Sequence, residues 1–139
     1  MSSGFDALTG FLGLVLATVI GSAITRLLIS PLVELRNMKA KIDKDISTYR
    51  HIITNPGGNH SQSEREDTRY ELREDASELV AKAESLPFYW LWSTLQLVPS
   101  RDAIENANDN LIFLSNRLSQ GDPIENDDKI QEIEDLLNI

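Results

Sequence analysis

The sequence predicts an all-α protein with one N-terminal transmembrane helix, followed by a cytoplasmic helical hairpin or three-helix bundle that carries a short aromatic helix. An uncharged apolar run lies near the N-terminus, and apolar residues recur at helical spacing through most of the remaining chain. Both tryptophans fall within Leu86–Pro99. We therefore divide the chain into a tail and membrane helix (1–30), a helical body (31–120) and an acidic C-terminal tail with a short helix (121–139).

The run from Ala7 to Thr25 contains no charged residue and is bounded by Asp6 and Arg26. About 20 apolar residues are enough to cross a bilayer as a helix, so we interpret this run as a transmembrane helix. A cleaved signal peptide is the alternative. It is disfavoured because no Lys or Arg precedes the run and no clear cleavage site follows it.

Basic residues after the membrane helix predict its orientation. They are Arg26, Arg36, Lys39, Lys41 and Lys44. Because Lys and Arg are enriched on the cytoplasmic side, we expect the N-terminus outside and the body in the cytoplasm, at the inner (plasma) membrane. The same residues could attract anionic headgroups, although topology and solvation alone are a sufficient explanation.

Small residues recur every four positions along the membrane helix. This small-residue ridge comprises Thr9, Gly13, Ala17, Gly21 and Thr25. Such a ridge lets a second helix approach closely and predicts packing against another copy or another membrane protein. The alternative is that small residues are simply common in membrane helices.

The first part of the body has the pattern of a helical hairpin over residues 32–86. Apolar residues at helical spacing run from Leu32 to Ile53, the turn-forming stretch 54–63 follows, and a heptad-like series returns from Glu64 to Leu86. We expect Pro31 to kink or break the helix at the membrane surface. Along the return helix, Arg65, Arg69 and Arg73 form one like-charge row, which we interpret as solvated or facing a partner.

Because the two arms have nearly equal lengths, the aromatic stretch should return to the membrane surface. A helix over 88–98 would place Phe88, Leu91, Trp92, Leu95 and Val98 on one side and Tyr89, Ser93 and Gln96 on the other. Tryptophan and tyrosine favour the headgroup zone. We interpret Phe88, Tyr89, Trp90, Leu91, Trp92 and Leu95 as an interfacial anchor, with an ordinary core helix as the alternative.

Ser100 is a natural N-cap for a packing helix over 100–120, whose stripe continues to Leu118 and which Gly121 and Pro123 end. The tail beyond it can form a short helix with Ile130, Ile133 and Leu136 or Leu137 on one side. The sequence leaves open whether this tail docks on the body.

Composition excludes several classes of function. Cysteine is absent, and a net charge of −9 disfavours nucleic-acid binding. His60 and Glu64 have a spacing that could share a metal, but two ligands without a third are weak evidence. We therefore expect no catalytic residues, no cofactor, no metal and no small-molecule substrate.

The segment Leu86–Leu118 resembles small uncharacterised bacterial membrane proteins with a membrane helix, a helical body and an aromatic stretch. The matching motifs are V-P-S-R at Val98–Arg101 and L-x-x-L-S-N at Leu111–Asn116. The resemblance implies a bacterial origin and this layout, and no site residues. We expect a membrane-anchored interaction or scaffold protein. Its expected partners are the lipid bilayer and either further copies of the same chain or another membrane protein. The alternative is a small membrane-permeabilising effector of the holin or phage-defence type.

Overall fold

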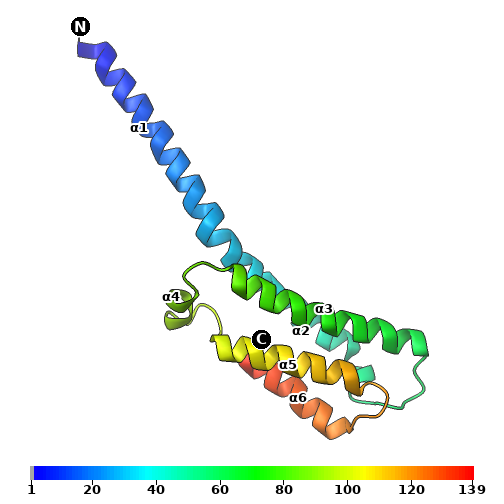
Figure 1. The fold of residues 1–139 in the computed structure, drawn as a ribbon. Helices are drawn as coiled ribbons and strands as arrows, with labels where there is room; N and C mark the ends of the chain where they lie inside the picture. The colour runs from blue at the N-terminus through cyan, green and yellow to red at the C-terminus, as the bar shows by residue number, and fades with distance from the viewer. Residues whose placement is uncertain (1) are drawn as a thin grey trace.

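The computed structural model describes the backbone of residues 2–139 and side chains from residue 9 onward. Met1 and the side chains of residues 2–8, Asp6 among them, lie outside the described part. Every secondary-structure element over residues 2–139 is a helix, which confirms the predicted class. One long N-terminal helix projects from a compact helical body (Figure 1).

Helix α1 (Ser2–Ile24) continues through a π-helical turn, η1 (Thr25–Ile29), into α2 (Ser30–Ile53). Among the described helices, this continuous segment is the one long and apolar enough to cross a membrane. Its large apolar side chains are exposed from Phe11 as far as Val33. The exposed apolar surface therefore extends past Arg26, beyond the end of the run predicted from the sequence.

Pro31 does not break the helix. Of the two outcomes that we predicted at Pro31, a kink or a break, the break is therefore wrong. In a regular α-helix, the proline ring clashes with the carbonyl group four residues earlier. Here the wider π-helical turn immediately precedes Pro31, and the Ser30 N–H donates to the Thr25 carbonyl five residues back. The chain therefore stays helical into the body and changes direction at this turn (Figure 1).

Four helices form the body: α2, α3 (Gln62–Ser85), α5 (Arg101–Arg117) and α6 (Pro123–Leu137). Each runs antiparallel to the one before it, and α6 packs against both α5 and α2 (Figure 1). The C-terminal tail thus supplies a fourth helix, so the body is larger than the hairpin or three-helix bundle that we predicted.

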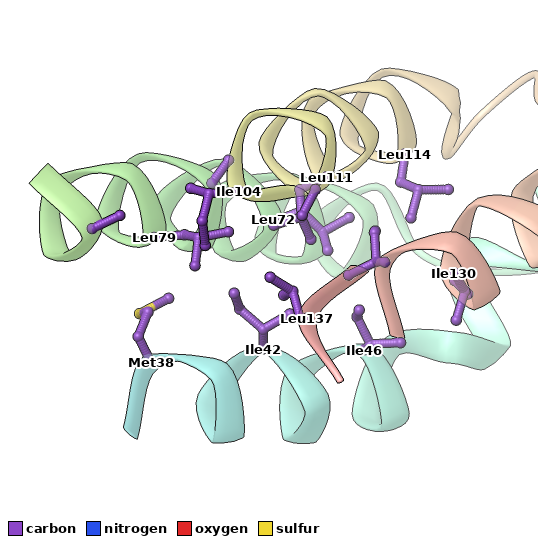
Figure 2. Close-up of a cluster of buried hydrophobic side chains, with 14 of the residues drawn as sticks. Met38, Ile42, Ile46, Leu72, Leu79, Ile104, Leu111, Leu114, Ile130 and Leu137 are labelled. Carbon is purple, nitrogen blue, oxygen red and sulfur yellow. The ribbon is translucent and has the colours of Figure 1, made fainter. Parts of the chain in front are cut away.

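The core lies between these four helices, and Figure 2 shows their apolar side chains converging. The largest fully buried side chains are Leu35, Ile42, Ile46, Ile53, Leu72, Leu79, Leu111, Leu114, Leu118, Ile130, Ile133 and Leu137. They follow the helical stripes read from the sequence, including Leu137 in the tail. Because burying one such side chain contributes about 1.5–3 kcal/mol, these stripes hold the bundle together.

The two ends of the body differ. At the distal end, where the loops 54–61 and 118–122 lie, Ser61 and Glu64 form a capping box that begins α3. The buried Asn126 side chain donates to the Ile53 carbonyl at 2.7 Å, which joins α6 to the end of α2. The opposite end, which we call the α4 end, holds helix α4 (Tyr89–Thr94) beside the junction with the N-terminal helix.

Candidate membrane interface

The aromatic segment, residues 86–98, joins α3 to α5 at the α4 end. Its helix α4 covers only Tyr89–Thr94, whereas we predicted a helix over 88–98. The reason is backbone conformation: Phe88 and Gln96 have φ of 53° and 56°, in the left-handed region. The helix therefore begins after Phe88 and ends before Gln96, and the predicted division into two faces is wrong.

Tyr89 is a core residue, which corrects its assignment to the interfacial anchor and to the polar side. It is 4% exposed, and its hydroxyl donates to the Pro99 carbonyl at 2.7 Å. The Arg101 guanidinium lies 4.7 Å from the centre of its ring, a cation–π geometry. Burial raises the pKa of the Tyr89 phenol. These contacts fix the aromatic segment to the start of α5 and give Arg101 of the V-P-S-R motif a structural role.

Trp92 also faces inward in part. Its indole N–H donates to the Pro87 carbonyl at 2.9 Å, and its ring packs against the core. By contrast, Trp90 is 69% exposed and Phe88 is 60% exposed. Leu91, Leu95 and Leu97 are exposed as well. Leu97 was not among the residues that we predicted for the interfacial anchor. Val98, predicted on the apolar side, is buried.

This exposed surface adjoins the end of the helix that is long and apolar enough to cross a membrane. A groove of about 410 Å³ lies between the two segments. Its lining is wholly apolar and comprises Ile20, Ala23, Ile24, Leu27, Leu28, Pro87 and Phe88. We call it the apolar groove. It places the aromatic segment level with the last turns of the helix that could cross a membrane.

A second groove, of about 230 Å³, lies further along the same helix, between the start of α2 and the end of the aromatic segment. It is lined by Leu32, Val33, Leu35, Arg36, Lys39, Leu97 and Val98. We call it the basic groove, because it combines an apolar floor with two cationic side chains.

The five predicted juxtamembrane basic residues have different environments. Arg26 lies in the π-helical turn, and Arg36, Lys39 and Lys44 lie along α2. Among the described side chains, no carboxylate is within ion-pair distance of Arg36 or Lys39. Burial and the neighbouring Arg36 charge lower the pKa of Lys39. These two cations are therefore uncompensated within the described chain.

Lys41, another of the five predicted basic residues, is partly exposed and forms ion pairs with carboxylates of the body. Its ammonium group contacts Asp75, lies 3.1 Å from Asp45 and lies 3.5 Å from Glu71. Burial lowers the pKa of Lys41, but the hydrogen bonds that its ammonium group donates to Asp75 and Asp45 outweigh this effect and raise the pKa. Asp75 has no exposed surface, and burial raises the pKa of its carboxyl to about 6, against the effect of Lys41.

We call Lys41, Asp45, Glu71 and Asp75 the Lys41 cluster. Sequence reasoning missed it, although one signal was available. Lys41 directly precedes Ile42, and Asp75 directly precedes Ala76, so both polar residues border the buried stripes. Adjacent stripes on antiparallel helices bring such bordering residues together, which the spacing on one helix alone does not reveal.

The two glycines of the small-residue ridge have open space beside them. A Cβ atom placed on Gly13 or Gly21 would have no neighbour within 4 Å in the described chain. The Thr25 hydroxyl donates to the Gly21 carbonyl at 3.0 Å, within its own helix. The ridge is thus open to a second helix, and its use in packing stays a prediction.

His60 and Glu64, whose spacing could share a metal, each contact another side chain of the described chain. The Glu64 carboxylate accepts hydrogen bonds from Ser61 in the capping box that begins α3. The His60 ring contacts the His51 ring edge-on. The described residues contain no group of three His, Asp or Glu placed to hold a metal.

The arginine row of α3 bonds neighbouring backbone and side chains. Arg69 donates to the Ser115 carbonyl at 3.2 Å. Arg73 donates to the hydroxyl of Ser115 at 3.2 Å and to the side chain of Asn116 at 2.8 Å. Arg69 and Arg73 thus face α5, where Ser115 and Asn116 of the L-x-x-L-S-N motif accept their hydrogen bonds, whereas Arg65 bonds the Gly58 carbonyl.

Comparisons with known proteins gave no match: no family model, no curated protein and no solved structure is similar to this chain. The geometry at the α4 end therefore carries the functional argument.

Proposed function

We propose that this protein is a non-catalytic, single-pass membrane protein whose four-helix body acts as an interaction or scaffold module on the cytoplasmic face of the inner membrane. In this arrangement the aromatic segment rests in the headgroup zone. The small-residue ridge packs against a second copy or another membrane helix. The body presents its charged surface to partners in the cytoplasm.

One observation carries the proposal. The N-terminal helix and the aromatic segment both expose apolar side chains, and the apolar groove lies between these two segments. Water disfavours such a surface, whereas a bilayer supplies a hydrocarbon core next to an interface that favours tryptophan. The basic residues after the membrane helix support the cytoplasmic orientation. The Lys41 cluster and the arginine row bond other parts of the chain, which supports a structural role for these polar groups.

The depth of each tryptophan in liposomes tests the proposal. The variants Trp92→Phe and Trp90→Phe each leave one tryptophan in the full-length protein. Lipids brominated near the headgroup should strongly quench the exposed Trp90, and should quench Trp92 less because it is partly buried and bonded to Pro87. If Trp90 were not quenched, the aromatic segment would not lie in the interface.

The open small-residue ridge also favours a second candidate, a membrane-permeabilising effector that assembles through α1. Expression followed by measurement of the membrane potential separates the two candidates. A collapse of the potential that Gly13→Leu and Gly21→Leu abolish would support the effector. Harmless accumulation in the membrane would support the scaffold module.

A further inference from the structure

We propose that the apolar groove and the basic groove together form a binding site for one anionic phospholipid. An acyl chain lies in the apolar groove, and the phosphate lies beside Arg36 and Lys39. This inference rests on the membrane placement proposed above and adds a specific lipid to it.

The lining of the apolar groove selects the kind of ligand. All of its lining residues are apolar, and they come from two segments, the end of the membrane helix and the start of the aromatic segment. The groove therefore fits a hydrocarbon ligand. The groove lies level with the last turns of the membrane helix, where the acyl chains of one leaflet are the hydrocarbon at hand.

The basic groove selects the sign of the headgroup. Arg36 and Lys39 are three positions apart on α2, so their side chains are neighbours on one face. Lys39 is partly buried, and neither residue has a carboxylate partner among the described side chains. A phosphate can accept charge-assisted hydrogen bonds from both cations and remove their mutual repulsion.

The length of the two grooves fits one lipid. Because the helix bends at the π-helical turn, the distance from Ile20 to Arg36 is at most about 24 Å, the value for a straight helix at about 1.5 Å per residue. One leaflet of a bilayer, headgroup included, is about 21 Å thick. A phospholipid with its phosphate at Arg36 would therefore place its acyl chain beside Ile20, in the leaflet that adjoins the body.

The test is a lipid titration of the full-length protein in detergent micelles, with bound lipids counted by native mass spectrometry. The probes are phosphatidylglycerol and phosphatidylcholine with identical palmitoyl and oleoyl chains. We expect one phosphatidylglycerol per chain, bound at least fivefold more tightly than phosphatidylcholine. Equal affinity for the two lipids, or no retained lipid, would overturn the site.

Three variants separate recognition from general attraction. Arg36→Gln and Lys39→Gln should each weaken phosphatidylglycerol binding at least threefold. Lys44→Gln removes the same charge from α2 outside the two grooves and should change it less than twofold. If Lys44→Gln weakened binding as much as Arg36→Gln, the effect would be non-specific attraction and the site would be wrong.

A fourth variant tests the apolar groove. Ala23→Leu narrows this groove without changing charge, so it should weaken both lipids to a similar extent. Unchanged binding of both lipids would remove the acyl chain from the groove. Quenching of Trp90 in liposomes distinguishes the two proposals: a quenched Trp90 with no lipid selectivity would overturn this site and leave the membrane placement standing.

Discussion

At the distal end of the body, polar bonds within the chain close the structure: Ser61 caps α3, the Arg65 guanidinium donates to the Gly58 carbonyl at 2.6 Å, and Asn126 ties α6 to Ile53. At the α4 end, Tyr89 and Trp92 bond other parts of the chain on the inner side, while Trp90 and its apolar neighbours face outward. The distal end of the bundle is thus closed by polar bonds, whereas the α4 end exposes apolar side chains.

This difference separates stability from function. Side chains in the core and at the distal end contact other parts of the chain, so their removal should cost folding free energy. The outward side chains at the α4 end contact little of the chain, so their removal should leave the fold intact and change only what the surface binds. Matched substitutions in the two regions test this separation.

The largest contrast is expected from one type of substitution at two sites. Leu111→Ala creates a cavity in the core, where Leu111 is fully buried, and should lower the free energy of unfolding by about 2–5 kcal/mol. Leu95→Ala, at a site that is 56% exposed, should change it by less than about 0.5 kcal/mol. Thermal unfolding of both variants in detergent micelles, followed by circular dichroism, measures the difference. A large loss for Leu95→Ala would mean that the α4 end stabilises the fold.

The sequence predicted the core well because helical periodicity reports burial directly. Apolar residues at intervals of three and four, such as Leu72, Ala76 and Leu79, could only be buried together, and they are. The same rule placed Ile130 and Ile133 on one side of the tail. It could not show that this side docks, because docking depends on the space that the other helices leave open.

The candidate interface was less predictable because it depends on backbone and long-range contacts. Periodicity assumed a regular helix through residues 88–98, and the left-handed conformations of Phe88 and Gln96 are not encoded in any apolar spacing. Burial of Tyr89 follows from its hydrogen bond to Pro99 and from its contact with Arg101. Engagement of Lys41 depends on Asp75, which lies on another helix.

A pH dependence is expected from the Lys41 cluster, inside the body. Burial raises the pKa of Asp75 to about 6 from its ordinary 3.8, so the folded protein holds this proton more tightly than the unfolded chain does. The stability that this group contributes is therefore complete below pH 3.8 and is lost as the pH rises through about 6.

The variant Asp75→Asn isolates this effect because its side chain cannot ionise. The free energy of unfolding of the wild type, minus that of Asp75→Asn, should fall by about 2–3 kcal/mol from about pH 3.5 to about pH 7.5, since one pKa unit corresponds to about 1.4 kcal/mol. Asp128→Asn, at an exposed site on α6, should show no such change. A difference that rose with pH would mean that attraction to Lys41 outweighs the burial of Asp75.

The smallest effect is expected from the strained backbone at the α4 end. Gln96 has φ of 56°, a conformation that costs a non-glycine residue about 1 kcal/mol. Gln96→Gly should therefore raise the free energy of unfolding by about 0.5–1 kcal/mol. Thr94→Gly, within α4, should lower it because glycine disfavours helix and the Thr94 hydroxyl bond to the Trp90 carbonyl is lost. Tyr89 and Trp92 still hold the aromatic segment in Gln96→Gly, so quenching of Trp90 by brominated lipids should be unchanged. If stability rose while that quenching fell, the strained backbone at Gln96 would be what keeps Trp90 exposed. The α4 end would then expose Trp90 at a cost in folding stability.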